Sequence, residues 1–487
     1  MSIPAEAFVL PGPGRGSLQQ RIRQMVTEAV VSGRFRAGQR MPSSRGLAQH
    51  LGISRITVTL AYAELVSSDY LAAKGRSGYF VSDTAPRAPD LPQRSHRAEA
   101  ADFARLLRPQ SDTLQVARPL DWERYPYSFI YGQIDPGLFD HQNWRLCAVR
   151  ALGRRDLGAL TQDYYDQDDP LLVEHLLGTI LPRRGIAAEP DDVLLTMGAQ
   201  NALWIAVAGL LGQGRKAVVE NPCYPGLRSI LGSSGTEIVP VDVDSDGLPP
   251  DRIPKGVDVV FTTASHQCPT NATMPLGRRL ALLEAAAREG FVIVEDDYEF
   301  EMSFLKPVSP ALKSLDAGGH VVYAGSFSKS VFPGMRLGYL VGPPSFIRVA
   351  RAIRMTMLRH PPGHVQRTMA YFLSLGHYDA QIARMRNAYR RRRQVMDEAF
   401  QEHGLRVAGQ GGFGGSSFWM RAPDMVDTEV LATRLRADEV LIEPGRAFFG
   451  PAQAPRNLYR LGYSSIAPAR IPEGVARIAA AIRRGLG

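Results

Sequence analysis

The chain has 487 residues, of which 45% are hydrophobic and 22% charged, a composition typical of folded globular proteins. Its length allows about two to four domains. No apolar run approaches the roughly 20 residues that span a bilayer, and no basic segment followed by an apolar one opens the chain. Three cysteines cannot make a disulfide framework, and their spacing suits no zinc site. We therefore expect a cytoplasmic protein without a membrane partner or a metal.

The positive charge is concentrated near the N-terminus. The net charge is +9, and residues 1–83 contain ten Lys or Arg but only five Asp or Glu, so this sixth of the chain carries +5. A small basic module is typical of proteins that bind a polyanion, most simply nucleic acid. A solvated surface is the alternative interpretation of the charge.

Within this basic part, the apolar spacing predicts three helices. Residues 17–32 form an amphipathic pattern. The segment Pro42-Ser43-Ser44 opens a second helix, which extends through Leu51. After a turn at Gly52, Ser54 caps a third helix with apolar positions Ile56, Val58, Ala61, Tyr62 and Leu65. Two helices joined by such a short turn form a helix-turn-helix.

A short hairpin follows the third helix. Tyr70–Leu71 and Gly78–Val81 read as strands, and the segment 72–77 between them is basic and contains glycine. This tip could reach a groove or the phosphates of DNA. At the start of the third helix, Arg55, Thr57 and Thr59 are placed where base edges would be read.

These residues resemble the winged helix-turn-helix of GntR-type bacterial repressors. The resemblance covers about residues 15–82 and is carried by the runs Gly38–Arg45 and Leu51–Val58, followed by Ala61-Tyr62. It implies that the residues contacting DNA are Arg45, Arg55, Thr57 and Arg76. A three-helix accessory or dimerisation domain is the alternative.

Beyond this module the pattern changes twice. Residues 82–119 are polar and contain five prolines, which predicts a linker with one short helix at Asp102–Leu107. The remaining chain alternates short apolar runs with helical stretches, including an apolar helix at Ala202–Leu211. We expect a mostly parallel sheet with helices on both faces, from strands at Val193–Thr196, Ala217–Val219, Val257–Thr262, Phe291–Glu295, Val321–Ala324 and Leu337–Val341.

One segment of the large part combines a lysine with phosphate-binding side chains. Lys329 follows a predicted strand, is flanked by Ser326 and Ser328, and precedes Arg336 by seven residues. A lysine that forms a Schiff base must be held at a fixed point, and hydroxyls with a guanidinium suit a phosphate. The set fits pyridoxal 5'-phosphate, and a solvated lysine is the alternative.

Other strand ends support the same cofactor. Asp296 closes an apolar strand, where a carboxylate could keep a pyridine nitrogen protonated. The turn Thr196–Gln200 opens a helix whose backbone amides could bind a phosphate. Tyr224 follows a third strand and could stack on a flat ring. The alternatives are a helix-capping aspartate, an ordinary α/β turn and a core aromatic.

In order, these segments resemble the fold type I aminotransferases, and more closely the MocR/GabR regulators, which join a GntR module to an aminotransferase-like domain. Three further segments carry the resemblance. They are Phe129–Phe139 with Trp144, the segment from Ser265 to Pro275, and Arg460–Tyr463. The implied fold class is an N-terminal winged helix-turn-helix, mostly α, plus a large α/β domain of the fold type I pyridoxal-phosphate-dependent aminotransferase type.

The resemblance also implies a role for each site residue. Lys329 would form the internal aldimine, Asp296 would pair with the pyridine nitrogen, and Tyr298 would bond the phenolic oxygen of the ring. Tyr224 would stack on the ring, and Arg460 would bind the anionic group of the effector. The phosphate would be held by Gly198, Ala199, Gln200, Ser326, Ser328 and Arg336.

Three departures from the family pattern concern the substrate side of the site. The usual Pro-Thr-Gly is Pro269-Thr270-Asn271, and Cys268 stands where an aromatic is common. The loop whose tyrosine reaches the phosphate of the partner subunit contains both Tyr164 and Tyr165, and either could serve. The effector therefore differs from that of better-known members, and the chain resembles the taurine- or ectoine-linked branch.

We expect a DNA-binding domain at 15–83, a linker at 84–120 and an effector domain at 121–487. The expected function is a homodimeric, bacterial transcriptional regulator that binds promoter DNA and senses an amino compound by aldimine exchange on Lys329. Two alternatives fit the same residues. One is an active aminotransferase with an accessory DNA module, recognised by full turnover, and the other is a DNA-binding protein with a dead scaffold, recognised by the lack of a cofactor band.

The arginine run Arg390–Arg393 lies in a predicted helix with apolar residues at Ile382, Met385 and Tyr389. We interpret it as a solvated helix face rather than a second nucleic-acid patch.

Overall fold

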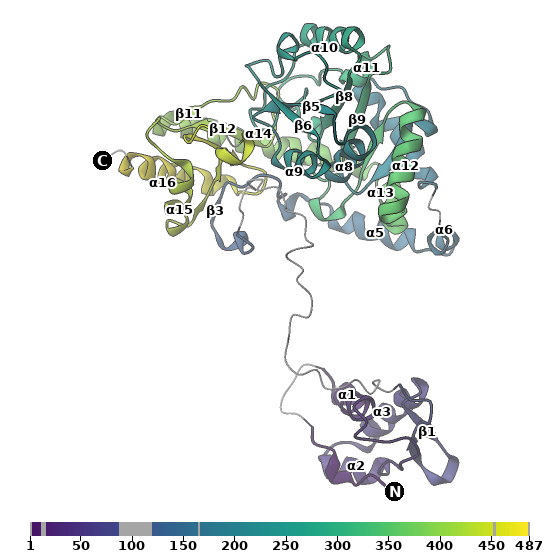
Figure 1. Cartoon of the computed structure of the whole chain (residues 1–487). Helices are drawn as coiled ribbons and strands as arrows, with labels where there is room; N and C mark the ends of the chain where they lie inside the picture. Colours follow the sequence, from purple (N-terminus) through teal and green to yellow (C-terminus); the bar gives the residue numbers. More distant parts are fainter. Residues whose placement is uncertain (1, 11–15, 87–118, 164–165, 451–453, 486–487) are drawn as a thin grey trace. The chain divides into compact units, whose positions relative to one another are not determined.

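The computed structural model describes residues 2–10, 16–86, 119–163, 166–450 and 454–485. The chain forms two compact units, Met1–Arg108 and Pro109–Gly487 (Figure 1). Most of the expected linker, including the helix expected at Asp102–Leu107, lies outside the described residues. No helix in these ranges is long and apolar enough to cross a membrane.

The small unit contains the predicted helix-turn-helix and hairpin. Ser17, Ser43 and Ser54 each cap a helix by accepting a hydrogen bond from a backbone N–H of the first turn. Gly52 ends the second helix in the left-handed conformation, with φ at 65°. The elements are α1 (Leu18–Val31), α2 (Ser44–Leu51), α3 (Arg55–Ser67), β1 (Leu71–Ala73) and β2 (Tyr79–Val81), the two strands being antiparallel.

One predicted core position of the third helix is wrong. Val58, Ala61 and Leu65 are fully buried, as is Tyr62, but Ile56 is 70% exposed. Positions 58, 61, 62 and 65 recur at helical spacing on one face, whereas position 56 lies two residues before that face begins. Ile56 therefore lies on the outward side of α3, together with Leu60, which is 49% exposed.

The large unit is built on a seven-stranded sheet with the order β4-β10-β9-β8-β7-β5-β6. All neighbours in it are parallel except β10, which is antiparallel to both β4 and β9. The predicted strands are confirmed, and the added edge strand is β6. The bounds are β4 (Val193–Thr196), β5 (Lys216–Asn221), β6 (Glu237–Asp242), β7 (Val259–Thr262), β8 (Val292–Asp297), β9 (Val321–Ser326) and β10 (Gly338–Val341).

Helices cover both faces of this sheet, as expected (Figure 1). One face packs against α8 (Ala199–Leu210), α9 (Pro225–Ser234) and α12 (Pro344–Leu358). The other packs against α10 (Leu276–Glu289) and α11 (Leu312–Leu315). The apolar run predicted as a buried helix is α8, and its residues Leu203, Ile205 and Ala206 lie in the core.

A second sheet forms the C-terminal part of the large unit, with the order β11-β12-β15-β14. A further strand pair, β3 with β13, joins the start of the unit to this part. The bounds are β3 (Tyr127–Ser128), β11 (Arg406–Val407), β12 (Ser417–Arg421), β13 (Val440–Leu441), β14 (Glu443–Pro444) and β15 (Leu458–Gly462). The remaining helices are α5 (His141–Ala151), α6 (Leu157–Thr161), α7 (Pro170–His175), α13 (Gly363–Ser374), α14 (His377–His403), α15 (Thr428–Ala437) and α16 (Ile471–Arg484).

The expectation that the arginine run of α14 is a solvated face is wrong for part of the run. Arg392 is buried and donates to the backbone of Ser464 and to Asp135. Arg393 stacks over the ring of Phe418, 4.5 Å from its centroid. These guanidiniums join α14 to the C-terminal part, because a buried arginine needs a carboxylate or carbonyl partner.

Candidate functional site

A cavity of about 460 Å³ opens at the carboxyl ends of the central strands. It gathers residues that are more than 250 positions apart in the sequence, because β4, β5, β8 and β9 all end at this edge of the sheet. The predicted residues that line it are Ala199, Gln200, Tyr224, Asp296, Tyr298, Ser326, Ser328, Lys329, Arg336 and Arg460. Gly198 is not one of these lining residues, but it directly precedes Ala199 at the N-terminus of α8.

One end of the cavity is suited to a phosphate-sized anion. Gly198 caps the N-terminus of α8, and a Cβ built on it would lie 3.3 Å from Nη2 of Arg336. That same nitrogen donates to the carbonyl of Met197 at 2.9 Å. The hydroxyl of Ser328 is buried and has no hydrogen-bond partner among the described residues, while Ser326 Oγ accepts from the Ser328 N–H at 3.2 Å. A helix N-terminus, a hydroxyl and a guanidinium together form an anion cradle.

Lys329 is held at the centre of the cavity. Its Nζ lies 4.3 Å from the ring centroid of Tyr131. A Cβ on Gly132 would lie 2.6 Å from the same nitrogen, so only glycine leaves the amine its place. The segment that contains Tyr131 and Gly132 therefore positions Lys329, which follows β9.

Asp296 presents an acceptor to the cavity. Successive side chains of a strand point to opposite faces, so Asp296 points away from the side that holds Glu295 and Asp297. Its Oδ1 is buried without a hydrogen-bond partner in the part of the chain that the structure describes. Burial, together with the negative charges of Asp297 and Glu220, raises the pKa of Asp296 to about 7, although the positive charge of Lys329 opposes this shift.

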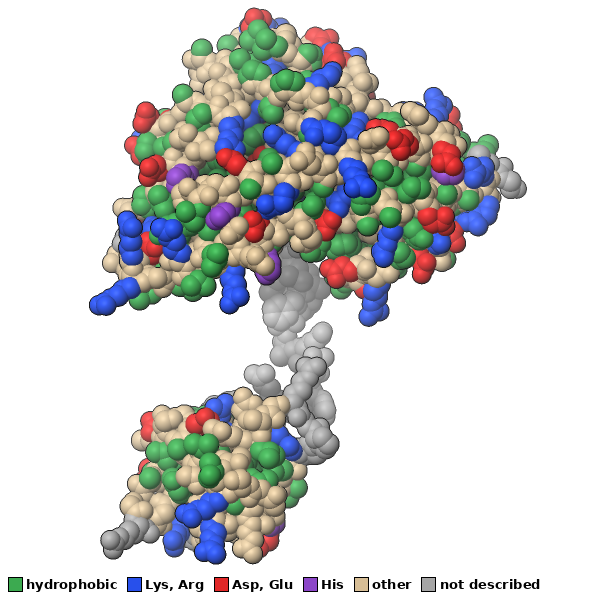
Figure 2. Space-filling model, turned by 180° about the vertical axis from the view of Figure 1, so that it is seen from behind, with side chains coloured by type: hydrophobic (Ala, Val, Ile, Leu, Met, Phe, Trp, Pro, Cys, Tyr) green, Lys and Arg blue, Asp and Glu red, His purple; other side chains and the backbone are tan. Residues whose placement is uncertain are grey.

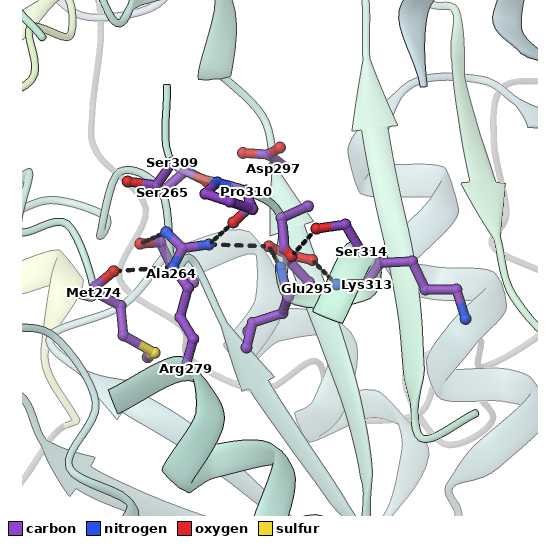
Figure 3. A network of polar contacts seen from close by, with 12 residues as sticks. Ala264, Ser265, Met274, Arg279, Glu295, Asp297, Ser309, Pro310, Lys313 and Ser314 are labelled. Carbon is purple, nitrogen blue, oxygen red and sulfur yellow. Dashed lines mark hydrogen bonds and ion pairs between the residues drawn. The ribbon is translucent and has the colours of Figure 1, made fainter. Parts of the chain in front are cut away.

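Buried arginines hold the two acids beside Asp296, and Figure 3 shows one of these contacts, between Arg279 and Glu295. Asp297 accepts from Nε of Arg184 at 2.6 Å, and both side chains are almost fully buried. Arg279 lies 3.8 Å from Glu295 and donates to the carbonyl oxygens of Met274, Pro310 and Ala264. Removing one partner of such a pair costs roughly 3–5 kcal/mol. The network therefore fixes the end of β8 and, with it, the position of Asp296.

A second buried carboxylate organises the loops around the cavity. Glu220, at the end of β5, accepts from the hydroxyls of Thr262 and Thr263 at 2.6 Å each. Gln267 Nε2 donates to Glu220 at 3.1 Å and to the carbonyl of Pro222 at 2.7 Å. Burial raises the pKa of Glu220, and these hydrogen bonds oppose that effect. Gln267, which lies in the segment from Ser265 to Pro275, thus helps to join the ends of β5 and β7.

The structure explains one departure from the family pattern. Asn271 adopts a positive φ of 58°, the region that glycine and, among other residues, asparagine enter most readily. Its Nδ2 also donates to the carbonyl of Ser417 at 2.6 Å, which ties this loop to β12. Cys268 lines the cavity, and burial raises the pKa of its thiol to about 12. The thiol is therefore neutral and acts as a small apolar wall.

Two tyrosines frame the space beside the lysine. Tyr224 donates to Oε1 of Gln200 at 3.3 Å, and a Cβ on Gly226 would lie 2.5 Å from its ring. The ring of Tyr298 lies 6.5 Å from that of Tyr131 at 80°. Burial raises the pKa of both Tyr224 and Tyr298, so each keeps its phenolic proton.

Arg460 is a further residue of the cavity lining, and it contacts two aromatic rings. Its carbon Cζ lies 4.1 Å from the ring centroid of Tyr131 and 4.6 Å from that of Phe448. Its Nε donates to Oε2 of Glu443 at 2.8 Å. Burial lowers the pKa of the guanidinium, but the carboxylate of Glu443, together with Cys268 and Tyr131, raises that pKa on balance. Arg460 is thus a fixed cation between two aromatic rings.

Sequence reasoning assigned no role to several residues of the site: Tyr131, Gly132, Glu220, Glu443 and Phe448. Tyr131 and Gly132 lie in a segment that the family pattern did single out, so its residues could have been assigned individually. Glu443 faces Arg460 across the β14–β15 pair, and no local spacing connects the two positions. The expected cross-subunit residues, Tyr164 and Tyr165, lie outside the described residues.

The candidate DNA-binding residues lie on the small unit. Arg45 and Arg55 are exposed, at the starts of α2 and α3, and Thr57 is half-buried. The hydroxyl of Thr59 donates to the carbonyl of Arg55 at 2.9 Å and is thereby engaged within the helix. The side chain of Arg76 falls outside what the structure describes. On the face that Figure 2 shows, one group of Lys and Arg side chains lies at the lower edge of this unit and others lie elsewhere on it, and those of the large unit are scattered among acids.

Comparisons with known proteins agree with both units. Residues 18–81 match the family of bacterial regulatory proteins, gntR family, and residues 140–478 match aminotransferase class I and II. The chain is 64% identical to the HTH-type transcriptional regulator TauR of Rhodobacter capsulatus, over 99% of this chain and 100% of that protein. It is 28% identical to the probable rhizopine catabolism regulatory protein MocR of Rhizobium meliloti, over 94% of this chain and 92% of that one.

Among solved structures, the chain is similar to LysN, the α-aminoadipate aminotransferase of Thermus thermophilus, in complex with N-(5'-phosphopyridoxyl)-L-leucine. The TM-score is 0.71 at 27% identity, over 79% of this chain and 99% of that one. The expected fold class is therefore confirmed: a GntR-type helix-turn-helix precedes a fold type I aminotransferase domain. The chain belongs to the MocR-type GntR family of transcriptional regulators that carry an aminotransferase class I and II domain.

Proposed function

We propose that this chain is a pyridoxal-phosphate-dependent regulator that binds promoter DNA through residues 15–83 and senses a small amino compound through residues 121–487. Residues 84–120 serve as the linker. The observation that carries the proposal is the convergence of Lys329, Asp296, Arg336 and Arg460 on one cavity. As a DNA-binding regulator it acts in the cytoplasm.

Three features of the cavity fit pyridoxal 5'-phosphate. The cradle at Gly198, Ser328 and Arg336 suits its phosphate, the unpaired acceptor of Asp296 suits its ring nitrogen, and Lys329 offers a primary amine. When bound, the cofactor supplies an aldehyde that reacts reversibly with primary amines. Asp296 would keep the ring nitrogen protonated, Tyr298 would donate to the phenolic oxygen, and Tyr224 would cover the ring.

The same geometry limits the effector. Lys329 Nζ and Arg460 Cζ both lie close to the Tyr131 ring, so they are no farther apart than the sum of 4.3 Å and 4.1 Å. A compound that reaches from the amine-reactive centre to the guanidinium is therefore short, with its anionic group a few bonds from its amine. Taurine has this form, and the relative named TauR supports it as the first compound to test.

The proposed assembly is a homodimer. Leu146, Val149 and Leu152 are 65%, 63% and 56% exposed and lie three residues apart on and just after α5. Such an exposed apolar stripe is suited to a second copy of the chain. Paired DNA-binding units would then contact two half-sites.

The visible absorption spectrum of the purified full-length protein tests the proposal. A cofactor band that changes on addition of one amino compound, and that is lost in Lys329→Ala, supports the sensor. Sustained conversion of the added compound to its oxo product would instead identify an aminotransferase. A colourless protein that takes up no added pyridoxal phosphate would contradict the proposal and leave a DNA-binding scaffold.

A further inference from the structure

Arg460, which lines the cavity, is paired with the carboxylate of Glu443, a residue outside the cavity lining. Glu443 and Arg460 face each other across the antiparallel strands β14 and β15. Nε of Arg460 donates to Oε2 of Glu443 at 2.8 Å, and the two side chains are only 7% and 2% exposed. A negative charge therefore lies permanently beside the cation that is expected to receive the effector.

We propose that Glu443 determines the charge specificity of the effector site: it makes the site accept an amino compound with one anionic group and reject one that carries two. This inference rests on the proposed function, in which Arg460 binds the anionic end of the effector. It adds that Arg460 acts as one half of a neutral pair rather than as a lone cation.

The hydrogen-bond geometry supports this role. Because Glu443 occupies Nε, an incoming anion meets only the two terminal nitrogens of the guanidinium. The rings of Tyr131 and Phe448 lie over the same group, so it cannot swing toward a second acceptor without losing both contacts. Arg460 can thus bind one anionic group through the two terminal nitrogens of its guanidinium.

The charge balance supports it as well. An anion that binds Arg460 leaves the pair and its ligand with one net negative charge. A second carboxylate on the ligand adds repulsion from Glu443 in a site where solvent screens little, because both partners are buried. Such repulsion is the element that specificity requires in addition to attraction.

Two matched pairs of ligands test the inference on the full-length protein loaded with pyridoxal phosphate. L-Cysteate is taurine with one additional carboxylate, and L-aspartate is β-alanine with the same addition. Dissociation constants are measured from the cofactor absorbance and, independently, by isothermal titration calorimetry. Within each pair we expect the wild type to bind the singly anionic compound more tightly.

In Glu443→Gln the preference within each pair should fall by about tenfold, mainly through tighter binding of the doubly anionic compound. Glu443→Asp keeps the charge and should keep the preference. Glu473→Gln is the matched control, because Glu473 accepts from Nε of Arg477 at the same 2.8 Å, but on the surface. This control should behave as the wild type.

Three results would overturn the inference. The first is a wild type that binds both members of a pair equally, which needs no variant and therefore holds even if Glu443→Gln does not fold. The second is an unchanged ratio in Glu443→Gln. The third is a parallel loss of affinity for all four compounds, which would mean that Glu443 only positions Arg460. A wild type that binds none of the probes would instead contradict the proposed function itself.

Discussion

The two units of this chain place their functional residues in opposite ways. In the small unit, the candidate DNA-binding residues follow local signals: a serine cap precedes each helix of the helix-turn-helix, and Arg45 and Arg55 lie exposed directly after those caps. In the large unit, Ala199 and Arg460 line the same cavity although they lie more than 250 positions apart, and Arg460 is buried in a pair with Glu443. The candidate DNA-binding residues are placed by the helices that carry them, whereas the cavity forms only when the strands of the central sheet have come together.

The largest effect is expected for Lys329→Ala, which should change the large unit and leave DNA binding by the small unit unchanged. In Lys329→Ala the cofactor loses its covalent attachment, so we expect the visible band of the purified protein to disappear and the effector response to be abolished. Binding to DNA should persist, because no residue of the small unit changes. Absorbance and fluorescence anisotropy with labelled duplex DNA measure the two properties. Loss of DNA binding in this variant would show that the units are not separable in this way.

Arg460→Gln should come next. Removing the guanidinium takes away the charge-assisted hydrogen bonds to the effector, and we expect its dissociation constant to rise by about 10–100-fold. Glu443 then loses its partner while buried, so the melting temperature should fall as well. Titration of the loaded protein with taurine and thermal unfolding measure the two effects. Effector binding that is unchanged would remove Arg460 from the site.

Arg55→Ala tests the small unit in the same manner. If Arg55 contacts a base edge, its loss should weaken specific DNA binding by about 1–3 kcal/mol and relax the preference at one base position. The cofactor spectrum should not change. Arg36→Ala, another exposed arginine of this unit, serves as the control for general charge. Equal losses in both variants would mean that Arg55 contributes only charge.

Asp296→Asn should change the free energy of unfolding by an amount that depends on pH. Because the pKa of Asp296 is raised to about 7 in the cofactor-free fold, the folded chain binds a proton there that the unfolded chain has released above about pH 4. The folded wild type thus loses stability as the pH rises from about 4 to 7.

The asparagine variant cannot ionise at this position. In the cofactor-free state it should be more stable than the wild type at pH 8, by on the order of a few kcal/mol, and this advantage should shrink toward pH 4. Urea unfolding at a series of pH values measures the difference. A constant difference across this range would mean that Asp296 does not titrate there.

The smallest effect is expected for Ile56→Ala. With the side chain 70% exposed, the free energy of unfolding should change by less than about 0.5 kcal/mol. Leu65→Ala, on the buried face of the same helix, should cost about 2–5 kcal/mol. Thermal or urea unfolding of the two variants compares them directly. Similar costs would place Ile56 in the core after all.

The same contrast determines how much of the molecule could be predicted from the sequence. The helices of the small unit and most strands of the central sheet follow from caps, turns and apolar spacing. Ile56 was misplaced because spacing alone does not define where the buried face of α3 begins. Arg392 was misplaced because its partner Asp135 lies far away in the sequence.

For the site, strand-end motifs predicted the residues that line the cavity, because motifs and topology coincide there. Pairings across the second sheet could not be predicted in this way. Glu443 has no local signal that connects it to Arg460, and Gly132 is favoured both by its positive φ of 84° and by the approach of the Lys329 amine. Contacts of this kind depend on the register between segments, which local patterns do not encode.

The proposed function requires that occupancy of the cavity in the large unit changes the affinity of the small unit for DNA. The most direct test is the dissociation constant of the full-length, cofactor-loaded protein for a duplex that it selects from a random pool, with and without taurine. The account predicts that the compound changes this constant in the wild type but not in Lys329→Ala. An identical constant with and without each amino compound that binds the cavity would contradict it.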